Sequence, residues 1–138
     1  MNALHCFPVR IYYEDTDHGG VVYHANYLRF MERARTEMLR SYGIELDQLQ
    51  NEHHVLFAVT TAKVNFIKPA RFNELLEVHT SIIRYSGARI YFQQNIVRED
   101  APGSYSELTC AEITVASISS QGTVMRIPEK ICQLLTAS

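Results

Sequence analysis

The feature of this sequence that most constrains its fold is one long amphipathic helix pattern with only strand-like runs and short segments around it. Between about His24 and Tyr42, apolar residues recur at intervals of three and four, as on a helix with one buried face. These positions are Tyr27, Phe30, Met31, Ala34, Met38 and Leu39. Gly43 follows, where helices favour glycine as a stop. Charged residues fill the other positions and are spaced to pair on the surface, at Arg33/Glu37, Glu32/Arg35 and Glu37/Arg40.

The segments on either side of this helix are predicted to be mainly β-strands. Val9–Tyr13 alternates and is rich in β-forming residues. After a looser segment at 44–54, which has room for one short helix, strand-like runs follow at Leu56–Ile67, Leu76–Ile82, Ile90–Ile96 and Thr109–Ile118. In the first run, alternation assigns one face to Leu56, Ala58, Ala62, Val64 and Phe66. A short C-terminal helix opens at Pro128.

The breaks between these runs predict how the strands are arranged. Turn-forming residues at 69–73, 86–87 and 100–103 leave too little chain for helical crossovers, so an antiparallel meander is expected. A single helix must bury its apolar stripe on that sheet, which gives an α+β two-layer domain with a five-stranded antiparallel sheet. Exposed strand edges and an uncovered, apolar outer face then predict a homo-oligomer.

Composition bounds the class of protein. The 138 residues have the size of a single domain covering 1–138. A formal net charge of −2 excludes the basic footprint of a general nucleic-acid binder. No run approaches the roughly 20 apolar residues of a membrane span, and the N-terminus lacks the pattern of a secretion signal, so a cytoplasmic protein is predicted. Three cysteines, Cys6, Cys110 and Cys132, lie far apart and are predicted to be free thiols.

A candidate catalytic site lies immediately before the long helix. The stretch Tyr13–His24 contains carboxylates and the glycine pair Gly19-Gly20, and it leads into the helix N-terminus. Glycine lets the backbone take positive φ and approach a ligand closely, while the first N–H groups of a helix lack acceptors and favour an anion. A carboxylate beside such a site can act as nucleophile or base on a carbonyl held there.

The same motif has other interpretations. It can be an ordinary turn, because Asp and Gly are common in turns. A calcium loop beginning at Asp15 would need a bidentate Glu at its last position, where this chain has Asn26. A divalent metal site built from Asp15, Asp17, His18 and His24 lacks a recognised ligand spacing. We therefore predict no metal ion and no cofactor.

The other residues that could carry chemistry show no pattern of their own. His53-His54 falls in a polar segment, and neither His5 nor His79 stands in a recognisable motif. No G-x-S-x-G follows a strand, and no cysteine has the local signature of a cysteine hydrolase. If this chain hydrolyses a substrate, the carboxylate route remains.

The run from Tyr13 to Tyr27, with Glu32–Glu37 after it, resembles the hotdog-fold acyl-CoA thioesterases of the 4-hydroxybenzoyl-CoA thioesterase superfamily. Within that superfamily, the chain is similar to the branch encoded beside the Tol–Pal cell-envelope genes. The resemblance extends from Pro8 through Pro69-Ala70-Arg71 to the C-terminal helix. It implies that a curved antiparallel sheet wraps the long helix, that two subunits pair their sheets, and that dimers often join into tetramers with sites at subunit interfaces.

The resemblance implies hydrolysis of acyl-CoA to free acid and CoA, without a metal or redox cofactor. Two other functions found among hotdog proteins stay open. One is a binding module that holds acyl-CoA or acyl carrier protein, or docks on phospholipid-synthesis or envelope partners. The other is a dehydratase, which normally uses a histidine with an acid from another segment. A pure binding module has no need of a carboxylate that faces the thioester.

Site residues are carried over from the family position by position. The catalytic carboxylate falls on Asp17, Tyr13 and His24 match the positions that accompany it, and Asp15 is expected to shape the turn. Substrate contacts are assigned to the start of the helix and to two arginines expected to bind CoA phosphates, namely Gly20, Val21, Tyr23, Arg84 and Arg89. Weaker phosphate candidates are Lys63, Lys68 and Arg71. His18 stands where the branch usually has a small residue and is expected to be an exposed loop side chain.

Overall fold

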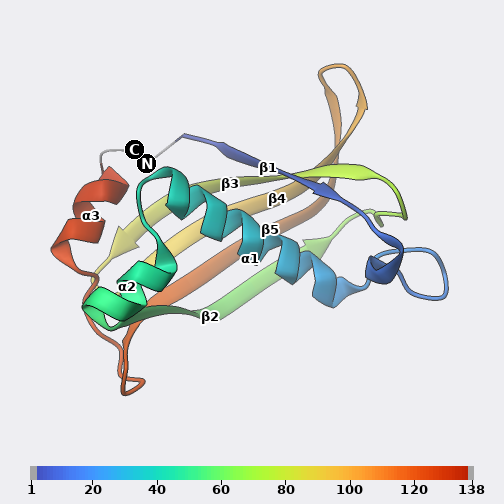
Figure 1. Cartoon of the computed structure of the whole chain (residues 1–138). Helices are drawn as coiled ribbons and strands as arrows, with labels where there is room; N and C mark the ends of the chain where they lie inside the picture. Colours follow the sequence, from blue (N-terminus) through green and yellow to red (C-terminus); the bar gives the residue numbers. More distant parts are fainter. Residues whose placement is uncertain (1–2, 137–138) are drawn as a thin grey trace.

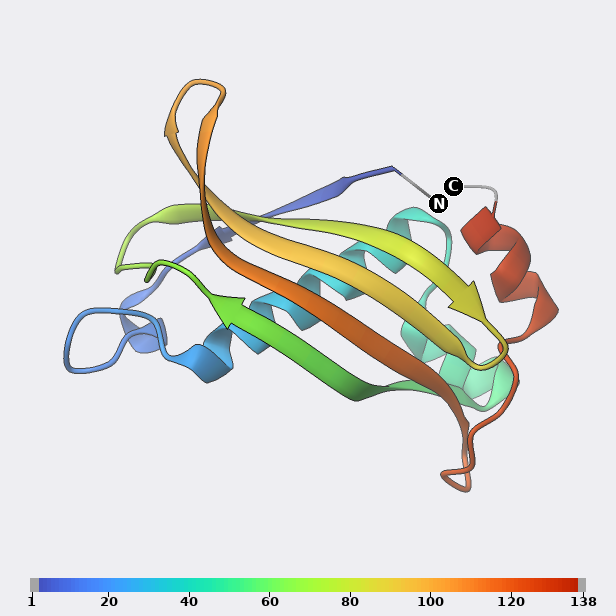
Figure 2. The same cartoon turned by 180° about the vertical axis from the view of Figure 1, so that it is seen from behind.

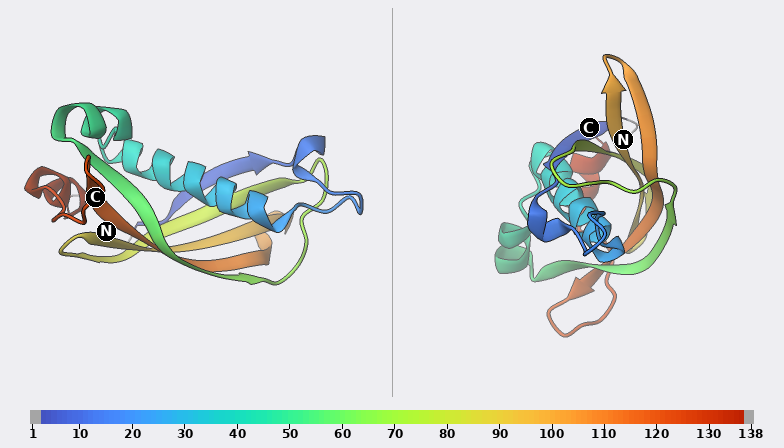
Figure 3. Two further views of the ribbon diagram at one scale, coloured as in Figure 1. Left: turned by 90° about the horizontal axis from the view of Figure 1, so that it is seen from below. Right: turned by 90° about the vertical axis from the view of Figure 1, so that its right-hand side faces the viewer.

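A long helix, α1, lies in the concave face of a curved five-stranded antiparallel sheet (Figure 1, Figure 3). The structure, a computed structural model, describes residues 3–136. Its elements are β1 His5–Arg10, η1 Tyr13–Asp15, α1 His24–Ser41, α2 Leu46–His53, β2 Val55–Phe66, β3 Leu75–Ser86, β4 Arg89–Ala101, β5 Ser104–Ser119 and α3 Glu129–Thr136. This arrangement confirms the predicted α+β hotdog fold.

The buried face of α1 is the one that its periodicity predicts. All six predicted apolar positions are buried and belong to the hydrophobic core: Tyr27, Phe30, Met31, Ala34, Met38 and Leu39. The helix stops where expected, because Gly43 takes a φ of +87° and its N–H and that of Ile44 return to carbonyls of the last turn.

The predicted surface pairing on α1 is only partly right. Arg40 pairs with Glu37, and also with Glu45 beyond the helix. Arg35 does not pair with Glu32, because it is buried and donates a 2.9 Å hydrogen bond to Oε1 of Gln94 on β4. Because Arg35 is charged and stands at the edge of the apolar stripe, it was expected to face solvent. The hydrogen bond to the uncharged Gln94 satisfies its guanidinium inside the protein.

The strand order is β1-β3-β4-β5-β2, so the predicted meander is correct only for β3, β4 and β5. β2 pairs with β5 at one edge of the sheet, and residues 67–74 then cross over to reach β3. The crossover does not form a hairpin turn between β2 and β3, because its backbone groups bond to other segments of the chain. Val22 N–H donates to the Ala70 carbonyl at 2.9 Å, and Ile11 N–H donates to the Glu74 carbonyl at 2.9 Å.

The first strand begins and ends earlier than predicted. β1 runs from His5 to Arg10, and the chain leaves the sheet before Tyr13, the predicted end of the strand. The 3₁₀ turn η1 replaces it, because the Asp15 carboxylate accepts a 2.8 Å hydrogen bond from the Tyr12 N–H. A short polar side chain that bonds its own backbone competes in this way with strand pairing.

A β-bulge resets the alternation of β2. Its register with β5 shifts between Val59 and Thr61, so inward and outward positions exchange at that point. Val55 is fully buried while Leu56 is 41% exposed, which contradicts the single face predicted from strict alternation.

Within residues 3–136, no helix covers the outer face of the sheet (Figure 2). Contrary to the prediction, this face is largely polar. Polar residues pair across the strands on this face, His79 with Asn95, and Gln93 with both Ser81 and Glu112. The core residues of the same strands lie on the other face of the sheet. The unpaired edges of β1 and β2, rather than an apolar face, remain the argument for self-association. None of the described helices combines the length and apolarity needed to cross a membrane.

Candidate active site

The Asp17 carboxylate is held by the turn that it belongs to. Its Oδ1 accepts hydrogen bonds from the N–H groups of Gly19 at 2.8 Å and Val21 at 3.3 Å. Gly20 takes a φ of +80°, which closes the turn and which other residues rarely adopt. No group within residues 3–136 donates to Oδ2. The turn therefore fixes the carboxylate through one oxygen and leaves the other without a donor among the described residues.

Helix α1 begins directly after this turn. Its N-cap residue is Tyr23, whose side chain makes no capping bond, and no acidic residue lies in the first turn. The N–H groups of His24 and Ala25 find no acceptor among the described residues. With the helix dipole behind them, these N–H groups can polarise a carbonyl oxygen.

Asp15 has the structural role that was predicted. Its side chain bonds the Tyr12 N–H, and its carbonyl oxygen accepts from the Tyr23 N–H at 3.2 Å and from Asn26 Nδ2 at 2.9 Å. These bonds tie η1 to the first turn of α1. Asp15 is thus occupied in positioning the Asp17 turn relative to the helix.

An apolar pocket of about 180 Å³ opens beside the start of α1. The His24 ring stacks on Phe66, with centroids 4.0 Å apart and an angle of 12° between planes. Tyr27 forms part of the wall, with its ring 5.5 Å from that of Phe66. Val21, which bonds Asp17, also lines the pocket, and Lys68 adds a positive charge at its border. An acyl group can fill such a pocket while its carbonyl faces the turn.

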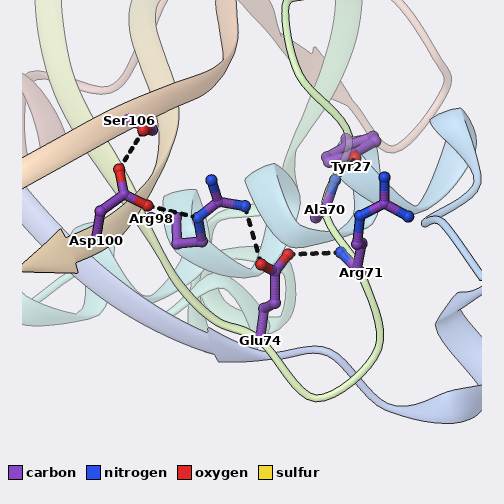
Figure 4. Close-up of polar contacts among 7 residues, drawn as sticks. All are labelled: Tyr27, Ala70, Arg71, Glu74, Arg98, Asp100 and Ser106. Carbon is purple, nitrogen blue, oxygen red and sulfur yellow. Dashed lines mark hydrogen bonds and ion pairs between the residues drawn. The ribbon is translucent and has the colours of Figure 1, made fainter.

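The crossover that completes this pocket is anchored at two places (Figure 4). In its middle, the Tyr27 hydroxyl accepts a 2.9 Å hydrogen bond from the Ala70 N–H. At its end, Glu74 accepts from the Arg71 N–H at 2.7 Å and from Arg98 at 2.9 Å. Burial, with a smaller contribution from Glu74, raises the pKa of Tyr27, so its phenol stays neutral.

The network continues from Arg98 into the β4–β5 hairpin (Figure 4). Arg98 Nε donates to Asp100 at 2.8 Å, and the Ser106 hydroxyl donates to the other oxygen of the same carboxylate. The bond from Ser106 and then that from Arg98 hold the pKa of Asp100 below its usual value. The hairpin and the crossover therefore meet through these side chains.

The remaining predicted residues are distributed unevenly. Tyr13 is 79% exposed and contacts Phe72 edge-on, while Tyr23 and His18 are exposed near the turn. Arg84 and Arg89 lie at the opposite end of the sheet, where the Arg84 guanidinium sits 3.8 Å above the Tyr91 ring. β3 runs between these two ends of the sheet, and its twelve residues span roughly 40 Å. A single subunit does not bring either arginine to Asp17.

The metal site that was considered from the sequence and set aside does not form among the described residues. Asp15, Asp17, His18 and His24 make no common group in that part of the chain, whereas Cys6, Glu77 and His79 do cluster. Sequence reasoning also assigned Tyr27 to the core alone and missed its bond to Ala70. The helical spacing of Tyr27 predicts that the residue is buried. Because a buried tyrosine hydroxyl usually needs a hydrogen-bond partner, that burial was the signal in the sequence for this bond.

A curved antiparallel sheet that wraps one long helix places this chain in the hotdog class of proteins. The chain belongs to the thioesterase superfamily, whose family model matches residues 19–105. It is 48% identical over 92 residues to the acyl-CoA thioesterase YbgC of Haemophilus influenzae, covering 67% of this chain and 68% of that protein.

Solved structures agree with this assignment. A probable thioesterase from Bartonella henselae superposes with a TM-score of 0.84 at 38% identity, covering 91% of this chain and 100% of that one. The 4-hydroxybenzoyl-CoA thioesterase from Pseudomonas sp. strain CBS-3 superposes with a TM-score of 0.87 at 17% identity, covering 95% and 98%. The second likeness extends the shared fold to a distant sequence.

Proposed function

We propose that this protein hydrolyses acyl-CoA thioesters to the free acid and CoA, with Asp17 as nucleophile or general base. One observation carries the proposal: the Asp17 carboxylate is fixed through Oδ1, beside a helix N-terminus and an apolar pocket. Membership of the thioesterase superfamily and the activity named for the Haemophilus influenzae relative support it.

The thioester carbonyl oxygen accepts hydrogen bonds from the first N–H groups of α1, at His24 and Ala25. A single donor of this kind contributes about 10²–10³ in rate, because it stabilises the negative charge that develops on the oxygen. The acyl chain lies against Phe66 and Tyr27, and the His24 ring fixed on Phe66 borders the reacting carbonyl.

Two chemical routes use the same carboxylate. In the first, Asp17 attacks the carbonyl carbon, the C–S bond breaks, CoA leaves as its thiolate, and water then hydrolyses the mixed anhydride. In the second, Asp17 removes a proton from water as the water attacks the carbonyl, the C–S bond then breaks, and CoA leaves as its thiolate, which takes up the proton from Asp17 or from solvent. Isotopically labelled water separates them, because label found in the Asp17 carboxylate after several turnovers identifies the first route.

The decisive experiment replaces Asp17 by Asn, which keeps the size of the side chain and removes its charge and its proton-accepting power. We expect kcat to fall by about 10² or more while acyl-CoA still binds. Asp15→Asn is the matched control, and it should reduce stability more than turnover, since the Asp15 carboxylate bonds only the backbone N–H of Tyr12. Wild-type turnover in a folded Asp17→Asn variant would refute the carboxylate mechanism.

A second candidate function is a binding module for acyl-CoA or acyl carrier protein. The separation of Arg84 and Arg89 from Asp17 within one subunit favours it, because binding of the nucleotide need not coincide with catalysis. Retained acyl-CoA binding without thiol release by the wild-type protein would support this function. As parts of the same proposal, we expect a cytoplasmic homodimer or homotetramer that works alongside the Tol–Pal cell-envelope proteins.

A further inference from the structure

A second cluster of reactive side chains lies on the outer face of the sheet, opposite to α1. Cys6 on β1 stands directly across from His79 on β3, and Glu77 precedes His79 by two residues on the same face. The Cys6 sulfur, a His79 ring nitrogen and a Glu77 carboxylate oxygen all lie within 4.8 Å of one another. Three different donor types therefore converge from two strands.

The spacing follows from sheet geometry. Directly opposite residues in an antiparallel pair have Cβ atoms about 4.5–5.5 Å apart, and residues at i and i+2 share a face. In a tetrahedral zinc site, bonds of about 2.0–2.3 Å place neighbouring ligand atoms roughly 3.3–3.7 Å apart. His79 Nε2 and Glu77 Oε1 are 2.7 Å apart, so these two ligands need to separate slightly, and the Cys6 sulfur lies within 4.8 Å of both. Rotation of side chains supplies such changes without moving the strands.

We propose that Cys6, Glu77 and His79 bind a divalent cation of the zinc type, with the fourth position taken by water. Sulfur, imidazole nitrogen and carboxylate oxygen are the donors that zinc accepts in proteins, and one thiolate selects against magnesium and calcium. The site is accessible, because Cys6 is exposed and the side chains of His79 and Glu77 are 20% and 37% exposed. The half-exposed Tyr105 flanks it, with its ring edge-on to His79 at 5.9 Å.

The ion would fasten β1 to the rest of the sheet. β1 is an edge strand, and β3 is its only partner in the sheet of the described chain. Cys6 lies more than seventy residues before its two co-ligands, so an unfolded chain does not bring the three together. Binding to the folded state alone raises stability by linkage. This role is structural and does not depend on the reaction proposed for Asp17.

The test uses the full chain without an affinity tag, titrated with Zn²⁺ and with Co²⁺ as a spectroscopic probe. We expect one ion per chain, a thiolate-to-cobalt charge-transfer absorption and a higher Tm in the presence of Zn²⁺. Cys6→Ser, Glu77→Gln and His79→Gln should each weaken binding by about tenfold or more, since even outer-shell changes cost that much. Cys110→Ser, on the same face of the sheet, and His53→Gln are the matched controls and should leave binding unchanged.

Several results would overturn the site. Absence of the thiolate absorption in the wild-type protein excludes Cys6 as a ligand, whatever the variants do. Equal affinity in wild type and Cys6→Ser, or an equal loss in Cys110→Ser, assigns the ion to other groups. Because the wild-type spectrum is read on the folded protein, a variant that fails to fold does not leave the question open.

Discussion

The Tyr27 hydroxyl accepts a 2.9 Å hydrogen bond from the Ala70 N–H and so joins the first turn of α1 to the β2–β3 crossover. Both residues are buried, at 2% and 0% exposure. The Ala70 carbonyl in turn accepts from the Val22 N–H, at the end of the Asp17 turn. One buried phenol thus holds together the three segments that form the candidate site.

Removing this phenol should destabilise the protein. Tyr27→Phe keeps the ring but leaves the buried Ala70 N–H without an acceptor, which costs about 1–3 kcal/mol. Urea unfolding measures the loss. Tyr23→Phe, at a half-exposed position in the same segment, is the control and should change stability little. Equal stability of Tyr27→Phe and wild type would show that the hydrogen bond makes no net contribution to the free energy of unfolding.

Stability should also fall at alkaline pH. Burial raises the pKa of Tyr27 and of Tyr42 above the ordinary value of 10.0, so the folded state keeps both phenols neutral while the unfolded chain ionises them. Their contribution is complete below the unfolded pKa and is lost as pH rises through the folded pKa. The unfolding free energy measured from about pH 9 upward should therefore decrease, and it should do so less steeply in Tyr27→Phe. An unchanged slope in that variant would contradict the assignment to Tyr27.

The two adjacent glycines of the turn should respond differently to alanine. At Gly20 an added Cβ meets nothing within 4 Å, but the φ of +80° makes any other residue strained, so Gly20→Ala should cost about 1–2 kcal/mol of stability. At Gly19 the added Cβ would lie 3.3 Å from Asp17 Oδ1. Gly19→Ala should therefore displace the carboxylate and lower kcat about tenfold or more with a smaller loss of stability. Steady-state kinetics and thermal melts on both variants test the difference, and identical profiles would refute it.

Arg89 can assist Asp17 only from another subunit, because the two lie at opposite ends of the sheet. Arg89→Ala should raise KM for acyl-CoA more than it lowers kcat. When Asp17→Asn and Arg89→Ala chains are co-expressed, half of the dimers are mixed, and each mixed dimer has one intact site. About a quarter of wild-type kcat/KM should return. Activity no greater than the average of the two separate variants would place Arg89 outside the site or within the same subunit.

Self-association itself is directly measurable. The unpaired edges of β1 and β2 predict that the active species is at least a dimer of the 15.8 kDa chain. Light scattering and activity measured on the same chromatographic fractions test this. Full activity in a monomeric fraction would contradict it.

The sequence by itself determined the elements whose causes are local. The buried stripe of α1, its stop at Gly43 and the turn around Asp17 all follow from neighbours within a few positions along the chain. Helical periodicity and side-chain bonds to nearby backbone need no distant partner, so they can be predicted from the residues alone.

Tertiary structure decided everything that depends on pairing between distant segments. Whether β2 joins β3 or β5, and which way the alternation runs beyond the bulge near Thr60, depends on strand register, and a shift of one residue exchanges the two faces. Arg35 is buried only because Gln94 of β4 lies opposite to it. Cys6 lies opposite to His79 only because of the register between β1 and β3. The side-chain pairs of the whole sheet stabilise that register, and no local pattern in the sequence encodes it.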